Sequence, residues 1–207
     1  RPGIVQIAGT GASCYGRNAA GKSWRSGGWG PLLSDEGSGY WLGLQAMKAA
    51  TRDSDGRSRS TALLPSVLAH LELSDIDQIM HRIYAQNMST SEIAALGPLV
   101  IECAQRGDVI SLEIIEEGVQ SMAECIAVVA GKLNLGDDCE LSLTGGVFQA
   151  GDIIINPLSN AVWKRLPGCR ITVAELPPAL GACLLALEML DIRLSPEAIH
   201  RLQQTAP

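Results

Sequence analysis

The chain has 207 residues, 46% of them hydrophobic and only 4% aromatic, with a formal net charge of −6. This length and apolar content suit one large domain with a substantial core, and the scarcity of aromatic residues favours an α/β protein over a β-sandwich. The acidic balance argues against a nucleic acid partner, because binding the phosphate backbone requires a basic face. No apolar run reaches the ~18 residues of a membrane-spanning helix, so we expect no membrane partner.

The first part of the chain alternates apolar runs with glycine-rich turns. The first run ends at Gly9-Thr10-Gly11, and the last closes in the glycine-rich stretch Gly27–Leu33. Apolar residues then recur at helical spacing. Three strands and a helix are expected, over residues 3–8, 13–18, 23–26 and 36 to about 51.

A block of helices is expected next, over about residues 61–135. Its longest helix carries a continuous apolar stripe and should pack along most of its length. We expect Ser74 to cap the second helix, and Thr90 or Ser91 to cap the third. The four helices are predicted at residues 63–71, 75–84, 91–104 and 108–135.

In the last part, strands and helices alternate, and Thr144-Gly145-Gly146 ends one of the strands. This order predicts a ribonuclease-H-like α/β domain: a mixed sheet with helices on both faces and an inserted helical block. Strands are predicted at 140–144 and 170–174, and helices toward 163, at 179–190 and at 196–203.

Six cysteines and three histidines are scattered along the chain. The cysteines form no Cys-x-x-Cys pair, and the histidines lack the spacing of metal ligands. A free cysteine on an apolar stripe behaves as a small hydrophobe. We therefore expect no metal site within the chain, and a cytoplasmic location.

Residues 16–23 match the phosphate-loop pattern G-x-x-x-x-G-K-[ST] at every position. That pattern binds phosphate only when a buried strand precedes it and a helix starts at the lysine. Here three glycines and a proline follow within residues 27–31, which prevents such a helix. We predict a β-hairpin turn at residues 18–21 instead.

Two glycine-rich turns could bind an anion. The backbone N–H groups of Gly9-Thr10-Gly11 can approach a phosphate closely, and the threonine hydroxyl adds a donor. Thr144-Gly145-Gly146 would let an adenosine or a phosphate lie against bare backbone. Taken singly, each turn is equally compatible with an ordinary loop between secondary-structure elements.

The segment from Gly27 to Gly37 combines dense glycine with one tryptophan and one aspartate. A carboxylate such as Asp35 accepts hydrogen bonds from vicinal hydroxyls, and an indole such as Trp29 packs on the apolar face of a sugar ring. The alternative is that Asp35 or Ser34 simply caps the following helix.

These motifs together resemble the N-acetylglucosamine kinase branch of the BadF/BadG/BcrA/BcrD ATPase family, within the actin-like ATPases. The spacing of Gly27-Gly28-Trp29-Gly30 and Asp35-Glu36-Gly37-Ser38 is specific to this branch, whereas the other two turns occur more widely among actin-like ATPases. One position departs from the pattern: Ala12 stands where the family often has serine. Ser13 or a backbone N–H would take over that role.

The resemblance implies an ATP-dependent kinase of N-acetylglucosamine or a related sugar, with ATP and Mg²⁺ as cofactors. It covers only the second of the two domains of such kinases, so residues 1–207 would be the C-terminal domain. The N-terminal domain would supply the catalytic base, and the chain alone would not turn over sugar. We also expect a homodimer. The resemblance assigns the sugar to Gly28, Trp29 and Asp35, and the nucleotide to Gly9, Thr10, Gly11, Gly97, Gly145, Gly146 and Gln149.

Two other functions are compatible with this fold. Related ATPase activators of acyl-CoA reductases or dehydratases hold an iron–sulfur cluster through cysteines in a loop between two subunits. Cys103 and Cys125 lie on predicted helices, and no cysteine pair flanks a glycine-rich loop, which disfavours this activity. A non-catalytic sugar sensor that kept the pocket is the third possibility.

Overall fold

The computed structural model describes residues 2–174 and 178–190, together with positions 192, 194, 195, 197, 198 and 201. It consists of two compact units, Arg1–Ile171 and Thr172–Pro207. The second unit contains α8 (Pro178–Met189), which matches the helix predicted at 179–190. The helix predicted at 196–203 lies largely outside the described residues.

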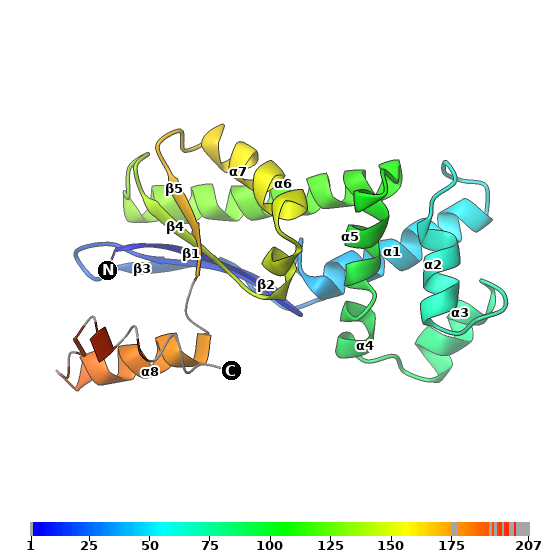
Figure 1. The fold of residues 1–207 in the computed structure, drawn as a ribbon, viewed down its shortest axis with the longest axis horizontal. Coiled ribbons are helices and arrows are strands. Elements are labelled where there is room, and N and C mark those ends of the chain that lie inside the picture. Colours follow the sequence, from blue (N-terminus) through cyan, green and yellow to red (C-terminus); the bar gives the residue numbers. More distant parts are fainter. Residues whose placement is uncertain are drawn as a thin grey trace. The chain divides into compact units, whose positions relative to one another are not determined.

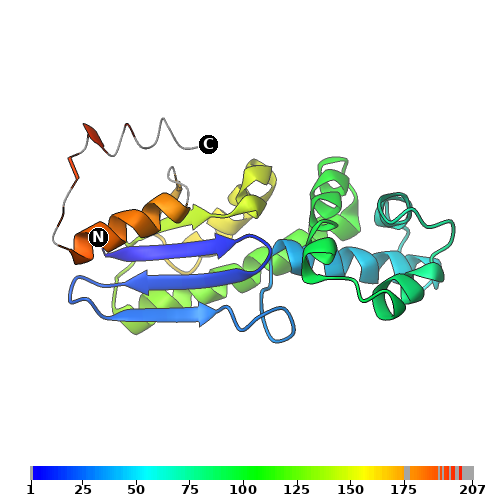
Figure 2. The same cartoon turned by 90° about the horizontal axis from the view of Figure 1, so that it is seen from below.

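A five-stranded mixed sheet has the order β3-β2-β1-β4-β5 (Figures 1 and 2). Strand β1 (Gly3–Ala8) runs antiparallel to β2 (Ala12–Arg17) and parallel to β4 (Glu140–Thr144). Strand β3 (Ser23–Gly27) pairs antiparallel with β2, and β5 (Arg170–Val173) is the last strand in the order. The mixed sheet and its helices confirm the predicted α/β fold.

The side chains of β1 alternate between a buried and a more open face. Ile4, Gln6 and Ala8 are buried on the face that the long helix α6 (Val109–Leu133) covers, with α7 (Asp152–Trp163) packed beside α6. The approach is close: a Cβ on Gly16 of β2 would lie 2.5 Å from Cγ1 of Val129 on α6. Helical cover of the opposite face stays a prediction.

A hairpin connects β2 and β3, as predicted. The amide of Gly21 donates to the carbonyl of Asn18 at 3.0 Å, and the amide of Lys22 donates to the Asn18 side-chain oxygen at 3.0 Å. The amide group of Asn18 in turn donates to the carbonyl of Leu133, which ties the hairpin to the end of α6. Because a strand follows Lys22 where a phosphate loop needs a helix, the phosphate-loop match is coincidental.

Several helices pack around α1 (Gly39–Ser54), beside the edge of the sheet where β1 and β3 end (Figure 2). Helix α1 contacts α4 through bare backbone, since a Cβ on Gly43 would lie 1.9 Å from the carbonyl oxygen of Ile93. The helices that contact α1 are α2 (Leu63–His70), α4 (Thr90–Ala94), α5 (Gly97–Gln105) and the N-terminal part of α6.

Two predicted helices of this block are wrong in extent. Residues 75–84 form only α3 (Gln78–Met80) and the π-helix η1 (His81–Ala85), and Ser74 bonds the side chain of Gln78 without capping a helix.

The helix predicted at 91–104 is two helices, α4 and α5. Pro98 lies in the first turn of α5, where a missing N–H is tolerated, so a new helix begins there. The cap of α4 is Ser89, not Thr90 or Ser91: its hydroxyl accepts from the amide of Glu92, whose carboxylate accepts from the amide of Ser89.

The N-terminus of α6 is anchored by Asp108. Its carboxylate accepts from the amide and hydroxyl of Ser111 at 2.9 and 2.7 Å, and from Thr61 and Ala62 at 2.8 and 2.9 Å. Partial burial opposes ionisation, but these four hydrogen bonds outweigh it and hold the pKa of Asp108 below its ordinary value. The carboxylate therefore joins α6 to the segment that leads into α2.

Replacing Asp108 by alanine should destabilise the fold by about 1–3 kcal/mol at neutral pH, because a cap and buried hydrogen bonds are lost. A carboxyl with a lowered folded pKa stabilises above its unfolded pKa of about 3.9, and this contribution disappears as the pH falls through the lower folded value. Urea unfolding at pH 7 and pH 2.5 checks this: the difference in stability between wild type and variant should be smaller at pH 2.5 than at pH 7. The exposed Asp55, paired with Arg57, is the control, and Asp55→Ala should change stability by less than about 0.5 kcal/mol.

Candidate functional site

A cavity of about 420 Å³ lies at the end of β1, between the start of α1, the α4–α5 junction and the 3-10 helix η2 (Gly146–Ala150). Its walls are apolar, and its remaining surface is largely backbone, with Thr10 as its polar side chain. Such a surface suits a purine ring against the walls and phosphates against the backbone. The lining residues are Gly9, Thr10, Gly39, Leu42, Ala94, Gly97, Pro98, Ile101, Gly146 and Val147.

Four of the seven residues predicted to contact nucleotide line this cavity: Gly9, Thr10, Gly97 and Gly146. A Cβ on Gly9 or on Gly146 would meet nothing within 4 Å, so their missing side chains keep the cavity open. Gly97 has another constraint, since its Cβ would lie 2.9 Å from the carbonyl oxygen of Gly39. Glycine there allows α5 to approach α1.

The other three predicted nucleotide residues lie outside the lining. Gly145 packs against β1, where its Cβ would lie 2.3 Å from the carbonyl oxygen of Ala8. Gln149 is exposed on η2, and Gly11 contacts Asp35. The sequence pattern does not separate Gly145 from Gly146, because only the fold reveals which of the two faces a strand.

The turn Gly9–Thr10–Gly11 is held by the start of α1. The amide of Gly39 donates to the carbonyl of Gly9 at 2.8 Å, and the amide of Tyr40 donates to the carbonyl of Thr10 at 3.1 Å. Within the turn, the amide of Gly9 donates to the carbonyl of Gly11 at 2.9 Å. These bonds fix the turn before any ligand arrives, which lowers the entropic cost of binding.

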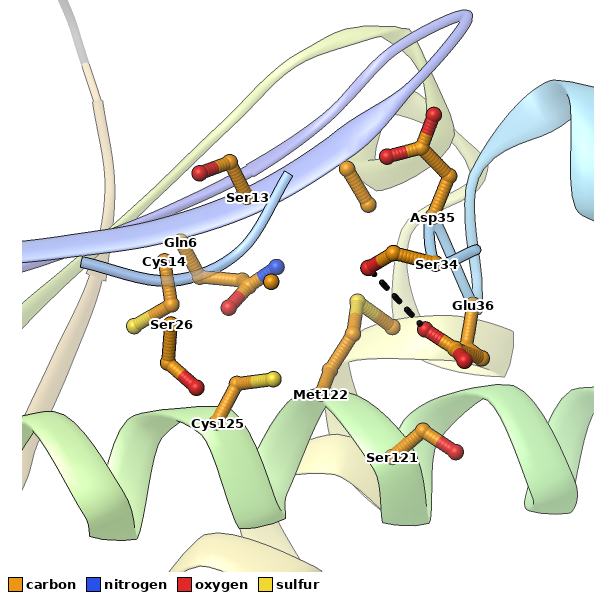
Figure 3. A pocket seen from close by; sticks show the side chains of 12 residues that line it. Gln6, Ser13, Cys14, Ser26, Ser34, Asp35, Glu36, Ser121, Met122 and Cys125 are labelled. Atoms are coloured by element: carbon orange, nitrogen blue, oxygen red, sulfur yellow. Dashed lines mark hydrogen bonds between the residues drawn. The ribbon is translucent and has the colours of Figure 1, made fainter. Parts of the chain in front are cut away.

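Asp35 lies on the other side of this turn. Its side chain is buried, with 6% of the residue exposed, and its backbone has the uncommon φ of +71°. A Cβ on Gly11 would lie 2.9 Å from Oδ2 of Asp35, so only glycine fits between the turn and the carboxylate. Figure 3 shows the carboxylate pointing away from Ser34 and Glu36, toward the β1–β2 turn.

The capping alternative for Asp35 is wrong. Helix α1 begins at Gly39, not at Glu36, and Ser38 is its N-cap, with its hydroxyl accepting from the amide of Trp41 at 3.1 Å. Among the described residues, none donates a hydrogen bond to the Asp35 carboxylate. A buried carboxylate in a strained backbone position, with its acceptors unused by the protein, is suited to binding the hydroxyls of a ligand.

Gly28 and Trp29 follow β3, on the segment that leads from this strand to Asp35. Gly28 has a φ of +68°, and its Cβ would lie 2.7 Å from the hydroxyl of Ser13. The Trp29 ring is 68% exposed, and the Arg25 guanidinium lies 4.9 Å from its centroid while donating to the carbonyl of Gly28 at 3.0 Å. Trp29 therefore presents an open indole on a supported loop.

A small buried pocket lies beside Asp35. Sequence patterns missed its deepest polar residue, Gln6, although a glutamine within an apolar strand was a visible signal. Two thiols also face this pocket, and burial together with the neighbouring Cys125 raises the pKa of Cys14, which keeps that thiol protonated. The pocket is lined by Gln6, Ala12, Ser13, Cys14, Ser26, Gly27, Ser34, Asp35, Glu36, Ser121, Met122 and Cys125 (Figure 3).

Within the described residues, no group of three or more histidine, cysteine or acidic side chains could hold a metal ion. In the described part of the chain, no helix is long and apolar enough to cross a membrane.

Comparison with known proteins identifies the relatives of this chain. A model of the BadF/BadG/BcrA/BcrD ATPase family matches residues 1–186. The chain belongs to this family. The match covers the whole of the first unit and part of the second, and it confirms the resemblance seen in the sequence motifs.

Two relatives of the chain bear the names of sugar kinases. An N-acetylmuramic acid/N-acetylglucosamine kinase of Clostridium acetobutylicum is 33% identical over 192 residues, which is 92% of this chain and 63% of that protein. An N-acetyl-D-glucosamine kinase of Dictyostelium discoideum is 35% identical over 188 residues, 89% of this chain and 59% of that protein. The chain thus spans about three-fifths of the length of these relatives.

Solved structures support the fold. A Chromobacterium violaceum protein, provisionally named N-acetylglucosamine kinase, superposes with a TM-score of 0.69 at 27% identity, over 89% of this chain and 59% of that one. A Porphyromonas gingivalis protein, with a TM-score of 0.62 at 19% identity over 84% and 56% of the two chains, shares the fold.

Proposed function

We propose that this chain carries the nucleotide and sugar sites of an ATP-dependent kinase that phosphorylates N-acetylglucosamine or a related amino sugar. One observation carries the proposal: the turn Gly9–Gly11 borders the 420 Å³ cavity on one side and contacts the Asp35 carboxylate on the other. A phosphate and a sugar hydroxyl bound at these two places would meet across a single turn. The names of both characterised relatives support this substrate class.

The residues have distinct roles in this proposal. Gly9, Thr10 and Gly146 bind the nucleotide, with Gly97 and the apolar walls of the cavity around its base. Asp35 accepts from sugar hydroxyls, and Trp29 packs on the sugar ring, while Gly28 brings this loop against Ser13. Gly11 keeps the carboxylate close to the phosphate turn. Gly145 supports this surface by packing against β1, and Gln149 lies outside the lining of the cavity.

Phosphoryl transfer requires positioned reactants, a metal ion on the phosphates and a carboxylate base near the acceptor. Mg²⁺ would neutralise charge on the phosphates, and residues of this chain orient the donor and the acceptor. We assign Asp35 to substrate binding and place the base in an N-terminal domain that closes over both sites. A homodimer and a cytoplasmic location remain predictions.

Two measurements test the proposal. Calorimetric titration of the 207-residue chain with a non-hydrolysable ATP analogue and Mg²⁺ should show one binding site, and the chain alone should release no ADP when N-acetylglucosamine is added. The complete protein should release ADP only in the presence of an amino sugar. Absence of nucleotide binding, or ADP release that ignores sugar, would refute the kinase. Sugar binding without ADP release from the complete protein would instead indicate the sensor.

A further inference from the structure

The buried pocket beside Asp35 contains an acceptor that the protein leaves unpaired. Gln6 is 2% exposed in the middle of β1, and its Oε1 has no hydrogen-bond partner among the described residues. The orientation of the amide is fixed by its other end, since Nε2 donates to the carbonyl of Ile7 at 3.1 Å. Turning the amide over would place Oε1 against that carbonyl, which is repulsive.

A buried acceptor of this kind needs a donor. Leaving it unsatisfied costs about 1–3 kcal/mol, and native proteins contain few such groups. Gln6 lines a small pocket with space of about 10 Å³, which is room for about one water molecule. Ser13, Ser26 and Ser34 line the same pocket, and a water there requires two to four polar partners of this kind.

The opposite wall of the pocket is the segment Ser34–Glu36. This segment carries Asp35, whose carboxylate binds sugar hydroxyls in our proposed function. The Ser34 hydroxyl donates to Glu36 at 3.5 Å, and Asp35 between them has the left-handed φ of +71°. Such a backbone conformation persists only where the surroundings enforce it. Figure 3 shows Gln6 on the sheet side of the pocket and Ser34 with Glu36 on the other side.

We propose that this cavity holds one ordered water, which donates to Gln6 Oε1 and bridges it to the Ser34–Glu36 segment, making Gln6 a positioning residue for Asp35. The water satisfies the orphan acceptor and links β1 to the loop. Gln6 itself touches no substrate. Its effect on the reaction passes through the placement of the Asp35 carboxylate, so the role of Gln6 in catalysis rests on the proposed function.

The water is tested without any sugar. In the 207-residue chain, the side-chain amide protons of Gln6 should show cross-relaxation with a long-lived water in NMR spectra. Gln6→Met, which replaces the amide by an apolar group of similar length, should lose this signal and lower the melting temperature. The proposal would be overturned if the Gln6 amide protons showed no cross-relaxation with a long-lived water. A higher melting temperature of Gln6→Met would overturn it too, because removal of a truly unpaired acceptor is neutral or stabilising.

The positioning role is tested by kinetics of the complete protein. Gln6→Met should raise the KM for N-acetylglucosamine about three- to tenfold, the equivalent of one lost hydrogen bond, and leave the KM for ATP unchanged. Gln6→Leu should behave alike. Ile4→Met, on the same face of β1, is the matched control and should leave the sugar KM unchanged.

A lower melting temperature with an unchanged sugar KM would show a purely structural residue and overturn the positioning role. If the wild-type protein phosphorylated no amino sugar, the proposed function and the positioning role would fall together. The NMR and unfolding measurements would still decide the water site, so the two failures are distinguishable.

Discussion

Gly145→Ala should prevent stable folding, whereas Gly146→Ala should fold normally and bind nucleotide poorly. Gly145 has a φ of +115°, and a Cβ there would lie 2.3 Å from the carbonyl oxygen of Ala8, at the end of the parallel pairing of β1 with β4. Neither backbone can yield without breaking the parallel ladder, so we expect a loss of about 3–5 kcal/mol.

Gly146 is the matched control in the neighbouring position. A methyl group there meets nothing within 4 Å and projects where the nucleotide would lie. The stability of Gly146→Ala should stay within about 1 kcal/mol of wild type, and the affinity of this variant for the ATP analogue should fall at least about tenfold. Urea unfolding and calorimetric titration separate the two effects. Equal stability of the two variants would contradict the structural role of Gly145, and unchanged affinity of Gly146→Ala would remove Gly146 from the nucleotide site.

Asp35→Asn should weaken sugar binding about 10- to 100-fold and leave the fold intact. A hydrogen bond to a charged group contributes about 1.5–3 kcal/mol, and the amide replaces one charged acceptor by a donor. Asparagine tolerates a positive φ, so the backbone at this position should not change. The sugar KM of the complete protein and the melting temperature of the variant are the measurements.

The control for Asp35 is Glu72→Gln. Glu72 also has a positive φ, of 53°, and lies in the helical block away from both proposed sites. The same change of carboxylate to amide should leave the sugar KM unchanged there. If Asp35→Asn kept its full affinity for sugar, the carboxylate would have no part in substrate binding.

The sequence predicts the sheet better than the helical block. Short runs between glycine-rich turns place the first three strands within one or two residues, and buried and open side chains alternate in β1 and β2 because α6 covers one face of these strands. The helix boundaries depend on local capping, and several candidate caps compete at each start. Ser38 and Ser89 cap their helices because the chain approaches in an extended conformation at those residues, which composition does not reveal.

In the candidate site, too, some features are predicted by the sequence and others depend on the fold. Motif spacing selects Gly9, Thr10 and Gly146, which the structure brings together around one cavity, and Asp35, which lies beside Gly11. It does not show that Gly145 and Gln149 lie outside the lining of that cavity, since a glycine that lines a cavity and one that packs on a strand look identical in the sequence. The contacts of Arg25 with Trp29 and the unpaired oxygen of Gln6 arise from three-dimensional packing of residues with no motif of their own.

Helix α6 has 25 residues and so extends about 37 Å, at a rise of about 1.5 Å per residue. Asp108 links the first turn of α6 to the segment that leads into α2. Gly118 packs against Gly37, two residues after Asp35, and Val129 packs against Gly16 of β2. Because α6 is a single continuous helix that contacts both, it holds the helical block in a fixed position relative to the sheet. The distance between the 420 Å³ cavity and Asp35 is therefore set when this unit folds.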